Sequence, residues 1–262
     1  MEILVCIKQV PGTSKVEVDE KTGVLKRDGV DSKMNPYDLY ALETALRLRK
    51  KIGGNVSVIT MGPPQATEVV KEAYMMGVDR GALISDRKFA GADVLATAYT
   101  ISQGIRKMGE FDLILCGKQT TDGDTAEVGP EIAEYLKIPH IANVIKIEEA
   151  NENEITVEMD MPNTIELNKV SYPCLLTIDK DIFQPRLPSY KKKLETKDRE
   201  IKTICLNDFE DKNENNYGLN GSATQVERIF PPSVNNDRET WTGSSEEVSS
   251  KIIGKLKQLK YV

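Results

Sequence analysis

Short apolar runs of strand length alternate with amphipathic segments over the first 140 residues of the chain. The apolar runs lie at residues 3–7, 56–60, 82–84 and 113–116. Between them, apolar side chains recur at helical spacing over residues 38–50, 65–76 and 93–108, and a further helical pattern covers residues 131–136. Strands that alternate with helices predict right-handed crossovers and a doubly wound, mostly parallel α/β sheet.

This alternation is interrupted early and again after residue 140. Two short runs at residues 16–18 and 23–25 predict a hairpin inserted between the first strand and the first helix. Beyond residue 140, runs separated by an acidic turn predict a small antiparallel extension, with strands at 143–147, 155–159 and 164–167. A final run at 174–178 predicts a strand that rejoins the main sheet.

The carboxyl-terminal part of the chain shows few core residues of its own. Residues 183–200 are polar and contain two prolines, residues 207–247 are rich in small polar side chains, and residues 246–259 form an amphipathic helical pattern. Such an arm either wraps its own domain or embraces a partner chain, and its length favours a partner. We therefore expect a main domain at 1–183, a protruding loop at 184–203, and an extended arm at 204–262 whose terminal helix packs on a partner subunit.

Composition and charge narrow the classes of function. The formal net charge of −6 argues against general nucleic-acid binding. No apolar run approaches the roughly 18–20 residues that span a bilayer, and the first residues resemble a strand rather than a signal peptide. We therefore expect a cytoplasmic protein without membrane insertion. The four cysteines lack the clustering of metal sites, and a single histidine without G-x-S-x-G argues against triad chemistry.

The most informative candidate site follows the strand at 113–116. Residues 116–130 have the sequence CGKQTTDGDTAEVGP, a loop rich in glycine and hydroxyl groups that leads into a helix. In an open parallel sheet, ligands bind at the carboxyl ends of the strands, where backbone N–H groups and a helix dipole attract phosphate. The other interpretation is a polar turn that caps the next helix.

Loops after other strands carry compatible chemistry. They lie at residues 6–11, 61–64 and 89–93, and the connectivity of a parallel sheet brings its loops to one edge. Small residues beside amide and hydroxyl donors suit an adenine nucleotide. Neither G-x-G-x-x-G nor a P-loop occurs, so the common dinucleotide and triphosphate fingerprints are absent from the sequence.

Seven segments, taken together, resemble the beta subunit of electron transfer flavoprotein over essentially the whole chain. In the family's order they are VCIKQVP at 5–11, MNPYD at 34–38, MGPPQ at 61–65, AYMMGVDR at 73–80, FAGADVLATAY at 89–99, the loop at 116–130, and Pro185-Arg186. The resemblance implies a Rossmann-like subunit that binds an adenine nucleotide. It also implies a larger alpha subunit as partner, which carries the flavin that passes electrons onward.

The resemblance leaves two nucleotides open. Ordinary members hold a structural AMP in the beta subunit. Bifurcating members hold FAD there, which takes a hydride from NADH and sends one electron to the alpha-subunit FAD and the other to a low-potential acceptor such as ferredoxin. The sequences at 122–130 and 89–97 resemble the bifurcating members, and so imply FAD with NADH as substrate. The chain would then be an electron-carrier subunit of an NADH-oxidising complex, and no side chain is expected to be catalytic because the flavin performs the redox chemistry.

Carried over by position, the resemblance implies two groups of site residues. Those around the nucleotide are Cys6, Asn35, Pro36, Tyr37, Asp38, Met61, Gln119, Thr120, Thr121, Asp122, Gly123, Asp124, Thr125, Val128 and Gly129, with Asp93 and Thr97 towards the isoalloxazine and ribityl end. The segment at 184–202 aligns with the family's recognition loop, which docks a flavin-dependent dehydrogenase. The docking residues would be Arg186, Leu187, Tyr190, Lys191 and Leu194, with Tyr190 in place of the usual leucine.

A function of a different class shares the same topology. Stand-alone ATP-binding domains of the stress-protein type also have an α/β fold with a nucleotide at the sheet edge. They typically carry a G-x(2)-G-x(9)-G-[ST]-like phosphate loop, which this chain lacks. Co-purification with a larger flavoprotein would separate the two functions.

Overall fold

The computed structural model describes residues 1–12, 32–227 and 238–262. The chain divides into two compact units, Met1–Glu227 and Arg228–Val262, each of which is described by itself. The hairpin expected at residues 16–25 lies outside the described residues.

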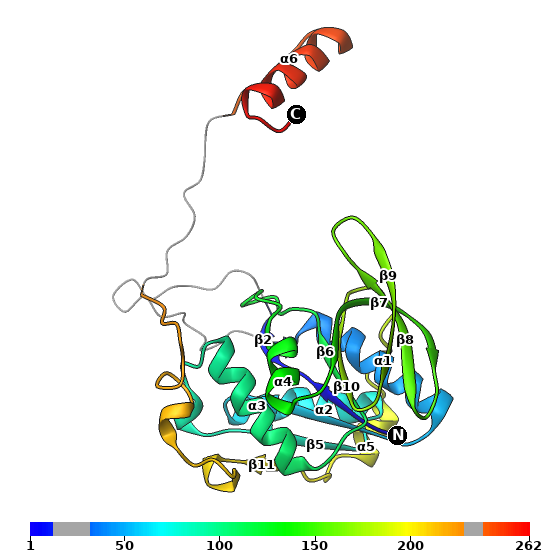
Figure 1. Ribbon diagram of the computed structural model, residues 1–262, viewed down its shortest axis with the longest axis vertical. Coiled ribbons are helices and arrows are strands. Elements are labelled where there is room, and N and C mark those ends of the chain that lie inside the picture. The colour runs from blue at the N-terminus through cyan, green and yellow to red at the C-terminus, as the bar shows by residue number, and fades with distance from the viewer. Residues whose placement is uncertain (13–31, 228–237) are drawn as a thin grey trace. The chain divides into compact units, whose positions relative to one another are not determined.

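In the described part of the first unit, nine strands form one sheet. They are β1 (Glu2–Cys6), β4 (Asn55–Met61), β5 (Arg80–Ile84), β6 (Leu113–Gly117), β7 (His140–Ala150), β8 (Glu154–Asp160), β9 (Ile165–Ser171), β10 (Cys174–Ile178) and β11 (Lys202–Ile204). The strand order is β11-β5-β4-β1-β6-β10-β7-β8-β9 (Figure 1). All neighbours from β11 to β7 pair in parallel, and β8 and β9 add antiparallel pairs at the other end. The predicted doubly wound, mostly parallel α/β sheet is therefore confirmed.

Helices cover both faces of the sheet. They are α1 (Pro36–Ile52), α2 (Thr67–Met76), α3 (Val94–Met108), α4 (Val128–Leu136) and the short α5 (Tyr190–Glu195). Successive side chains of a strand point to opposite faces, so Ile3 and Val5 pack in the layer with α1 and α2, whereas Leu4 packs in the layer with α3 and α4. This two-sided burial explains why the strands have continuous apolar runs rather than alternating ones.

Local sequence signals set the helix ends close to where the periodicity predicts them. Gly77 ends α2 with φ +121°, a conformation that residues with a β-carbon rarely adopt. The carboxylate of Asp93 caps α3 by accepting a hydrogen bond from the Ala96 N–H, at 3.0 Å. A separate two-stranded sheet, β2 (Gln9–Pro11) with β3 (Ser32–Met34), brackets the undescribed segment.

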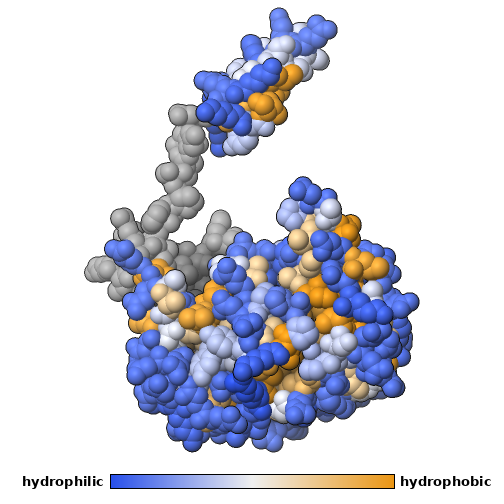
Figure 2. Space-filling view, viewed as in Figure 1, coloured by the Kyte–Doolittle hydropathy of each residue, from blue (hydrophilic) through white to orange (hydrophobic). Residues whose placement is uncertain are grey.

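The antiparallel extension has one packed face and one open face. On the packed face, Ile155 and Val157 of β8 join the core layer that contains α1 and α2. On the open face, Ile165 and Leu167 of β9 are exposed. Figure 2 shows apolar surface gathered along this extension, within a face that is otherwise largely polar.

The segment after residue 200 packs on its own domain, which differs from the expected division at residue 204. Strand β11 pairs in parallel with β5 at the edge of the sheet. Farther along, Phe209 and Tyr217 are buried and stack around Phe89, each with its ring centroid 5.5 Å from that of Phe89. The first unit therefore extends to Glu227. Isolated aromatic anchors among polar residues give no periodic signal, so the pattern of apolar positions did not reveal this packing.

The described part of the second unit contains one helix, α6 (Ser245–Gln258). Ser244 and Glu247 form a capping box at its start, which fixes the first residue of the helix close to the prediction. The helix has an apolar side (Figure 2), and none of its residues is buried. Ile252 in the helix and Leu259 directly after it are exposed apolar side chains. Across the residues that the structure describes, no helix is both long and apolar enough to cross a membrane.

Candidate functional site

The candidate site lies at the carboxyl ends of β1, β6 and β10, which are adjacent in the sheet. Cys6 ends β1 and is paired in register with Cys116 of β6, which is paired in turn with Thr177 of β10. The loop at 118–127 leaves this edge and leads into α4, while α1 begins beside it. The parallel connectivity therefore brings these predicted loops together, as the sequence indicated.

Asn35 joins the start of α1 to the loop after β6. Its side-chain amide nitrogen donates to the Gln119 carbonyl at 2.9 Å, and its side-chain oxygen accepts from the Thr121 N–H at 3.2 Å. The same nitrogen donates to Oδ1 of Asp38, also at 2.9 Å. Asn35 is completely buried. Its role in the structure is therefore to fix the loop, since its polar atoms are already engaged by the protein.

Asp38 forms a second buried link, between α1 and β1. Its Oδ2 accepts the Lys8 N–H at 2.7 Å. Burial raises the pKa of Asp38 to about 7, although its hydrogen bonds to Asn35 and to the Lys8 N–H act in the opposite direction. The carboxyl group thus gains its charge near neutral pH, at the centre of the candidate site.

Gly117 is required where α1 approaches the end of β6. A β-carbon at this position would lie 2.4 Å from Oδ1 of Asp38 and 2.7 Å from the backbone carbonyl carbon of Tyr37. Gly129 plays the same part for α4, because a β-carbon there would lie 2.6 Å from Cγ2 of Thr177. Both helix starts therefore sit against the sheet edge at a distance that only glycine allows.

The loop between β6 and α4 is held by its own hydrogen bonds and by one ion pair. Lys8 contacts Asp122, with 2.8 Å between Nζ and Oδ1. Partial burial acts to raise the pKa of Asp122, but the ion pair with Lys8, together with hydrogen bonds from Thr120 and the Gly123 N–H, lowers it overall. Thr120 accepts hydrogen bonds from the backbone N–H groups of Gly123 and Asp124. The Gln119 amide donates to Asp124.

The start of α4 leaves hydrogen-bond donors available at this edge. Its N-cap residue, Glu127, makes no side-chain capping bond, so the first backbone N–H groups of the helix, at Val128 and Gly129, are not capped by that side chain. Thr121 and Thr125 in the preceding loop are exposed. An uncapped helix start that follows exposed hydroxyl groups is a suitable arrangement for binding phosphate.

The structure places Asp93 and Thr97 in the first turns of α3, apart from the links around Asn35. Besides capping α3, Asp93 accepts bonds from the N–H and the hydroxyl of Thr224, at 2.8 and 2.9 Å. The charge of Asp93 also contributes to raising the pKa of Glu131 in α4, after burial and Glu127. The starts of α3 and α4 are therefore near neighbours, and Thr97 lies half-buried one turn along α3.

The remaining nucleotide candidates occupy the same edge. Met61 ends β4 and packs, partly buried, on the layer with α3 and α4. Pro36 and Tyr37 form the first turn of α1 and are half-buried. The sequence analysis did not include Lys8 or Gly117 among the site residues. Lys8 directly follows the predicted strand at 3–7 and Gly117 ends β6, and this position at a strand end is the signal that could have identified them.

The predicted docking residues lie on another part of the first unit, where α5 packs against α2. Arg186 is anchored to the buried carboxylate of Glu43 in α1, with 2.7 Å between Nε and Oε2. Beyond this anchor, three apolar side chains are strongly exposed, at 87% for Leu187, 74% for Tyr190 and 61% for Leu194. Lys191 is exposed beside them.

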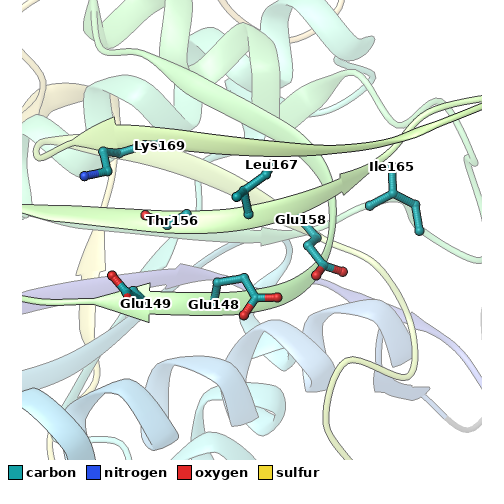
Figure 3. Close-up of a pocket in the computed structure, with 7 residues that line it drawn as sticks. All are labelled: Glu148, Glu149, Thr156, Glu158, Ile165, Leu167 and Lys169. Atoms are coloured by element: carbon teal, nitrogen blue, oxygen red, sulfur yellow. The ribbon is translucent and has the colours of Figure 1, made fainter.

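An open hollow of about 570 Å³ lies elsewhere, on the open face of the antiparallel extension (Figure 3). Its lining combines three acidic, two apolar, one hydroxyl and one basic side chain from β7, β8 and β9, namely Glu148, Glu149, Glu158, Ile165, Leu167, Thr156 and Lys169. Because it lacks exposed helix starts and glycine-rich backbone, its chemistry does not suit a phosphate. The sheet edge, and not this hollow, is therefore the candidate site for a phosphate-bearing ligand.

Comparisons with known proteins identify the family of the chain. A family model described as "Electron transfer flavoprotein domain" matches residues 22–208. The "Electron transfer flavoprotein subunit beta" of Thermoanaerobacterium thermosaccharolyticum is 43% identical over 258 residues, which cover 98% of each chain. The subunit of the same name from Clostridium acetobutylicum is 41% identical over the full length of both chains. The "Caffeyl-CoA reductase-Etf complex subunit CarD" of Acetobacterium woodii is 43% identical, again over 98% of each chain.

The family match covers most of the chain, and the relatives match it from end to end. The resemblance inferred from the sequence motifs is therefore confirmed. The chain belongs to the electron transfer flavoprotein family, as a beta subunit.

Proposed function

We propose that this chain binds FAD at the carboxyl edge of its sheet and works in a heterodimer with an electron transfer flavoprotein alpha subunit. When bound, the FAD would accept a hydride from NADH and divide its electrons between the alpha-subunit FAD, which serves a flavin-dependent dehydrogenase, and a low-potential acceptor such as ferredoxin. The similarity to a subunit of a caffeyl-CoA reductase-Etf complex supports a partner of the reductase or dehydrogenase class.

The main support for a nucleotide at this edge is the start of α4, whose first N–H groups have no side-chain cap. Asn35, Asp38 and Gly117 fix the backbone around it. The phosphates would bind the N–H groups of Val128 and Gly129 and the hydroxyl groups of Thr121 and Thr125. Backbone donors and the helix dipole would supply this attraction, because Lys8 is already paired with Asp122 and Lys118 with Asp179.

The adenosine half of the ligand would lie by the residues that end β1 and β4 and begin α1. These are Cys6, Asn35, Pro36, Tyr37, Asp38 and Met61, with Gln119, Thr120, Asp122, Gly123 and Asp124 holding the loop above them. The distal half would extend towards Asp93 and Thr97 at the start of α3, which is near the start of α4. The protein's contribution is to position the ligand and set its surroundings.

A structural AMP is the second candidate ligand, and one observation favours it. The carboxylate of Asp93 already accepts bonds from Ala96 and from both polar groups of Thr224, so it offers little to a flavin without rearrangement. AMP would require only the adenosine and phosphate contacts. The two candidates therefore differ in whether the start of α3 takes part.

Flavin counting on the complex co-expressed with its alpha subunit tests this proposal. We expect two FAD molecules per heterodimer and bleaching of flavin absorbance by NADH. One FAD and one AMP per heterodimer would instead assign the AMP-binding role. A stable monomer that retains ATP and no flavin would support the stand-alone nucleotide-binding domain and contradict both heterodimer functions.

We infer the partner surfaces from the exposed apolar side chains. We propose that Leu187, Tyr190 and Leu194 dock the dehydrogenase, with Arg186 fixing the base of the segment and Lys191 steering an acidic surface. The terminal arm with α6 would pack on the alpha subunit, because its apolar side needs a partner to cover it.

A further inference from the structure

Two thiols lie side by side at the carboxyl ends of β1 and β6. Cys6 and Cys116 are register partners in neighbouring parallel strands, and both side chains belong to the layer with α3 and α4. The Cys6 thiol is near enough to Cys116 to contribute to raising its pKa. Neighbouring strands lie about 4.8 Å apart, which is within the range of roughly 4.4–6.8 Å between α-carbons that a disulfide bridges. The register therefore places the two α-carbons within the range that a disulfide can span.

The two cysteines differ in how solvent reaches them. Cys6 is half-buried, whereas Cys116 is only 6% exposed. The neighbouring thiol of Cys6, burial and the charge of Asp38 all raise the pKa of Cys116. A small oxidant would therefore meet Cys6 first, and Cys116 would act as the second, resolving thiol.

The position of the pair connects it to the candidate nucleotide site. Cys6 is two residues before Lys8, whose N–H binds Asp38, and Cys116 directly precedes Gly117, whose α-carbon lies against the same carboxylate. A bond between the two sulfur atoms would thus link β1 and β6 beside the two backbone segments that contact Asp38. Cys6 is also among the residues expected to contact the nucleotide.

We propose that Cys6 and Cys116 are a reversible oxidation site that forms an intrachain disulfide with a peroxide, and that a nucleotide bound at the sheet edge protects it. The protection rests on the proposed function, whereas the disulfide does not. Cys6 sulfur attacks one peroxide oxygen, the O–O bond breaks, and a sulfenic acid and one water form. Cys116 sulfur then attacks Cys6 sulfur, the S–O bond breaks, and the hydroxide leaves as water with the proton of Cys116. Two thiols lose two electrons in total, and one peroxide is reduced to two waters.

The other two cysteines provide matched controls. Cys174 is fully buried in the opposite core layer, with α1 and α2. Cys205 is half-buried, and its thiol donates to Asp208 at 3.2 Å. Neither is a register partner of Cys6 or Cys116.

The test treats the reduced full chain with hydrogen peroxide and counts free thiols after denaturation. We expect the count to fall from four to two, a single Cys6–Cys116 linked peptide in non-reducing mass spectrometry, and full recovery with dithiothreitol. Cys116→Ser should abolish the linked peptide, and Cys205→Ser should preserve it. A linked peptide that contains Cys205, or four surviving thiols under conditions that oxidise a surface cysteine of a control protein, would overturn the disulfide. The thiol count and the linked peptide are both measured on the wild-type chain, so the test remains valid even if a variant folds poorly.

A second arm compares the nucleotide-loaded chain with the chain stripped of nucleotide. We expect the loaded chain to lose its two thiols several-fold more slowly. Equal rates in the two forms would contradict protection at Cys6. A purified chain that holds no nucleotide in either form would instead contradict the proposed function, while the thiol count would still decide the disulfide.

Discussion

At the scale of single residues, the carboxyl edge of the sheet depends on polar groups that the fold has removed from water. Asn35 and Asp38 are buried, and they bind the backbone of two separate loops. Removing such a side chain leaves its partners unsatisfied, which costs about 1–3 kcal/mol for each buried group. These residues therefore shape the site by holding backbone rather than by presenting free functional groups.

Asp38→Asn tests this through the pH dependence of unfolding. The pKa of Asp38 is about 7 in the folded chain, against an ordinary value of 3.8, so the folded chain keeps this proton to higher pH than the unfolded chain. The contribution of Asp38 to the free energy of unfolding is complete below pH 4 and is lost as the pH rises to 7. Over this range the free energy of unfolding falls by up to about 1.4 kcal/mol per pH unit. We expect denaturant titrations at pH 4 to 8 to show this component in the wild type and its loss in Asp38→Asn. Parallel pH profiles for the two chains would contradict the raised pKa.

Arg186→Ala tests the anchor of the docking segment. Glu43 is almost completely buried, and it accepts bonds from Arg186 and Arg47. Without Arg186 its charge is only partly compensated, so we expect the free energy of unfolding to fall by about 1–3 kcal/mol and proteolysis near residue 187 to accelerate. Arg47→Ala, which removes one bond and leaves the anchor, is the matched control. Equal proteolysis of the two variants would show that the anchor does not fix the segment.

At the scale of elements, two helix starts meet the sheet through glycine. The approach of α1 to β6 at Gly117, and of α4 to β10 at Gly129, leaves no room for a β-carbon. Close approach brings the backbone N–H groups and the dipole of α4 to the edge where the phosphates would bind. The positions of these helices, and not only their sequences, thus create the candidate site.

Gly117→Ala should therefore disturb the candidate site, although it adds only one methyl group. The added methyl group would push Asp38 and the backbone of Tyr37 away, with an expected cost of about 1–3 kcal/mol. We expect a parallel loss of bound nucleotide, measured by absorbance of the extract from the purified complex. Gly254→Ala is the control, because nothing lies within 4 Å of its added carbon. Retention of nucleotide at the wild-type level in Gly117→Ala would contradict the assigned position.

At the scale of the whole molecule, the chain consists of a complete α/β domain and a separate terminal unit. The domain has its own two-layered core within Met1–Glu227, whereas none of the residues of α6 is buried. A helix with an uncovered apolar side gains most of its stability from packing on another element. This contrast is what we expect of an arm that binds a partner.

Deletion of residues 238–262 tests the role of that arm. We expect the unfolding midpoint of the main domain to change little, because its core residues lie within the first unit. Association with the alpha subunit should weaken at least tenfold, measured by co-purification and by titration of the two subunits. Deletion of residues 260–262 alone, which leaves α6 and Leu259 in place, is the control. Undiminished association of the longer deletion would place the subunit contact elsewhere.

The sequence by itself determined the class of fold, most helix limits and the loop that forms the candidate site. Apolar periodicity and the caps at Gly77 and Asp93 are local signals, so a single sequence contains them in full. The motif at 116–130 likewise predicted a ligand-binding loop after a buried strand. These features depend on residues that are close together in the chain.

Only the tertiary structure decided which distant residues meet. It paired Lys8 with Asp122, Cys6 with Cys116 and Arg186 with Glu43, and it buried Phe209 and Tyr217 beside Phe89. Each contact joins segments far apart in the sequence, and the local sequence around one residue does not predict which distant residue it will contact. The physical reason is that burial, register and close approach are properties of packed elements, which exist only once the chain has folded.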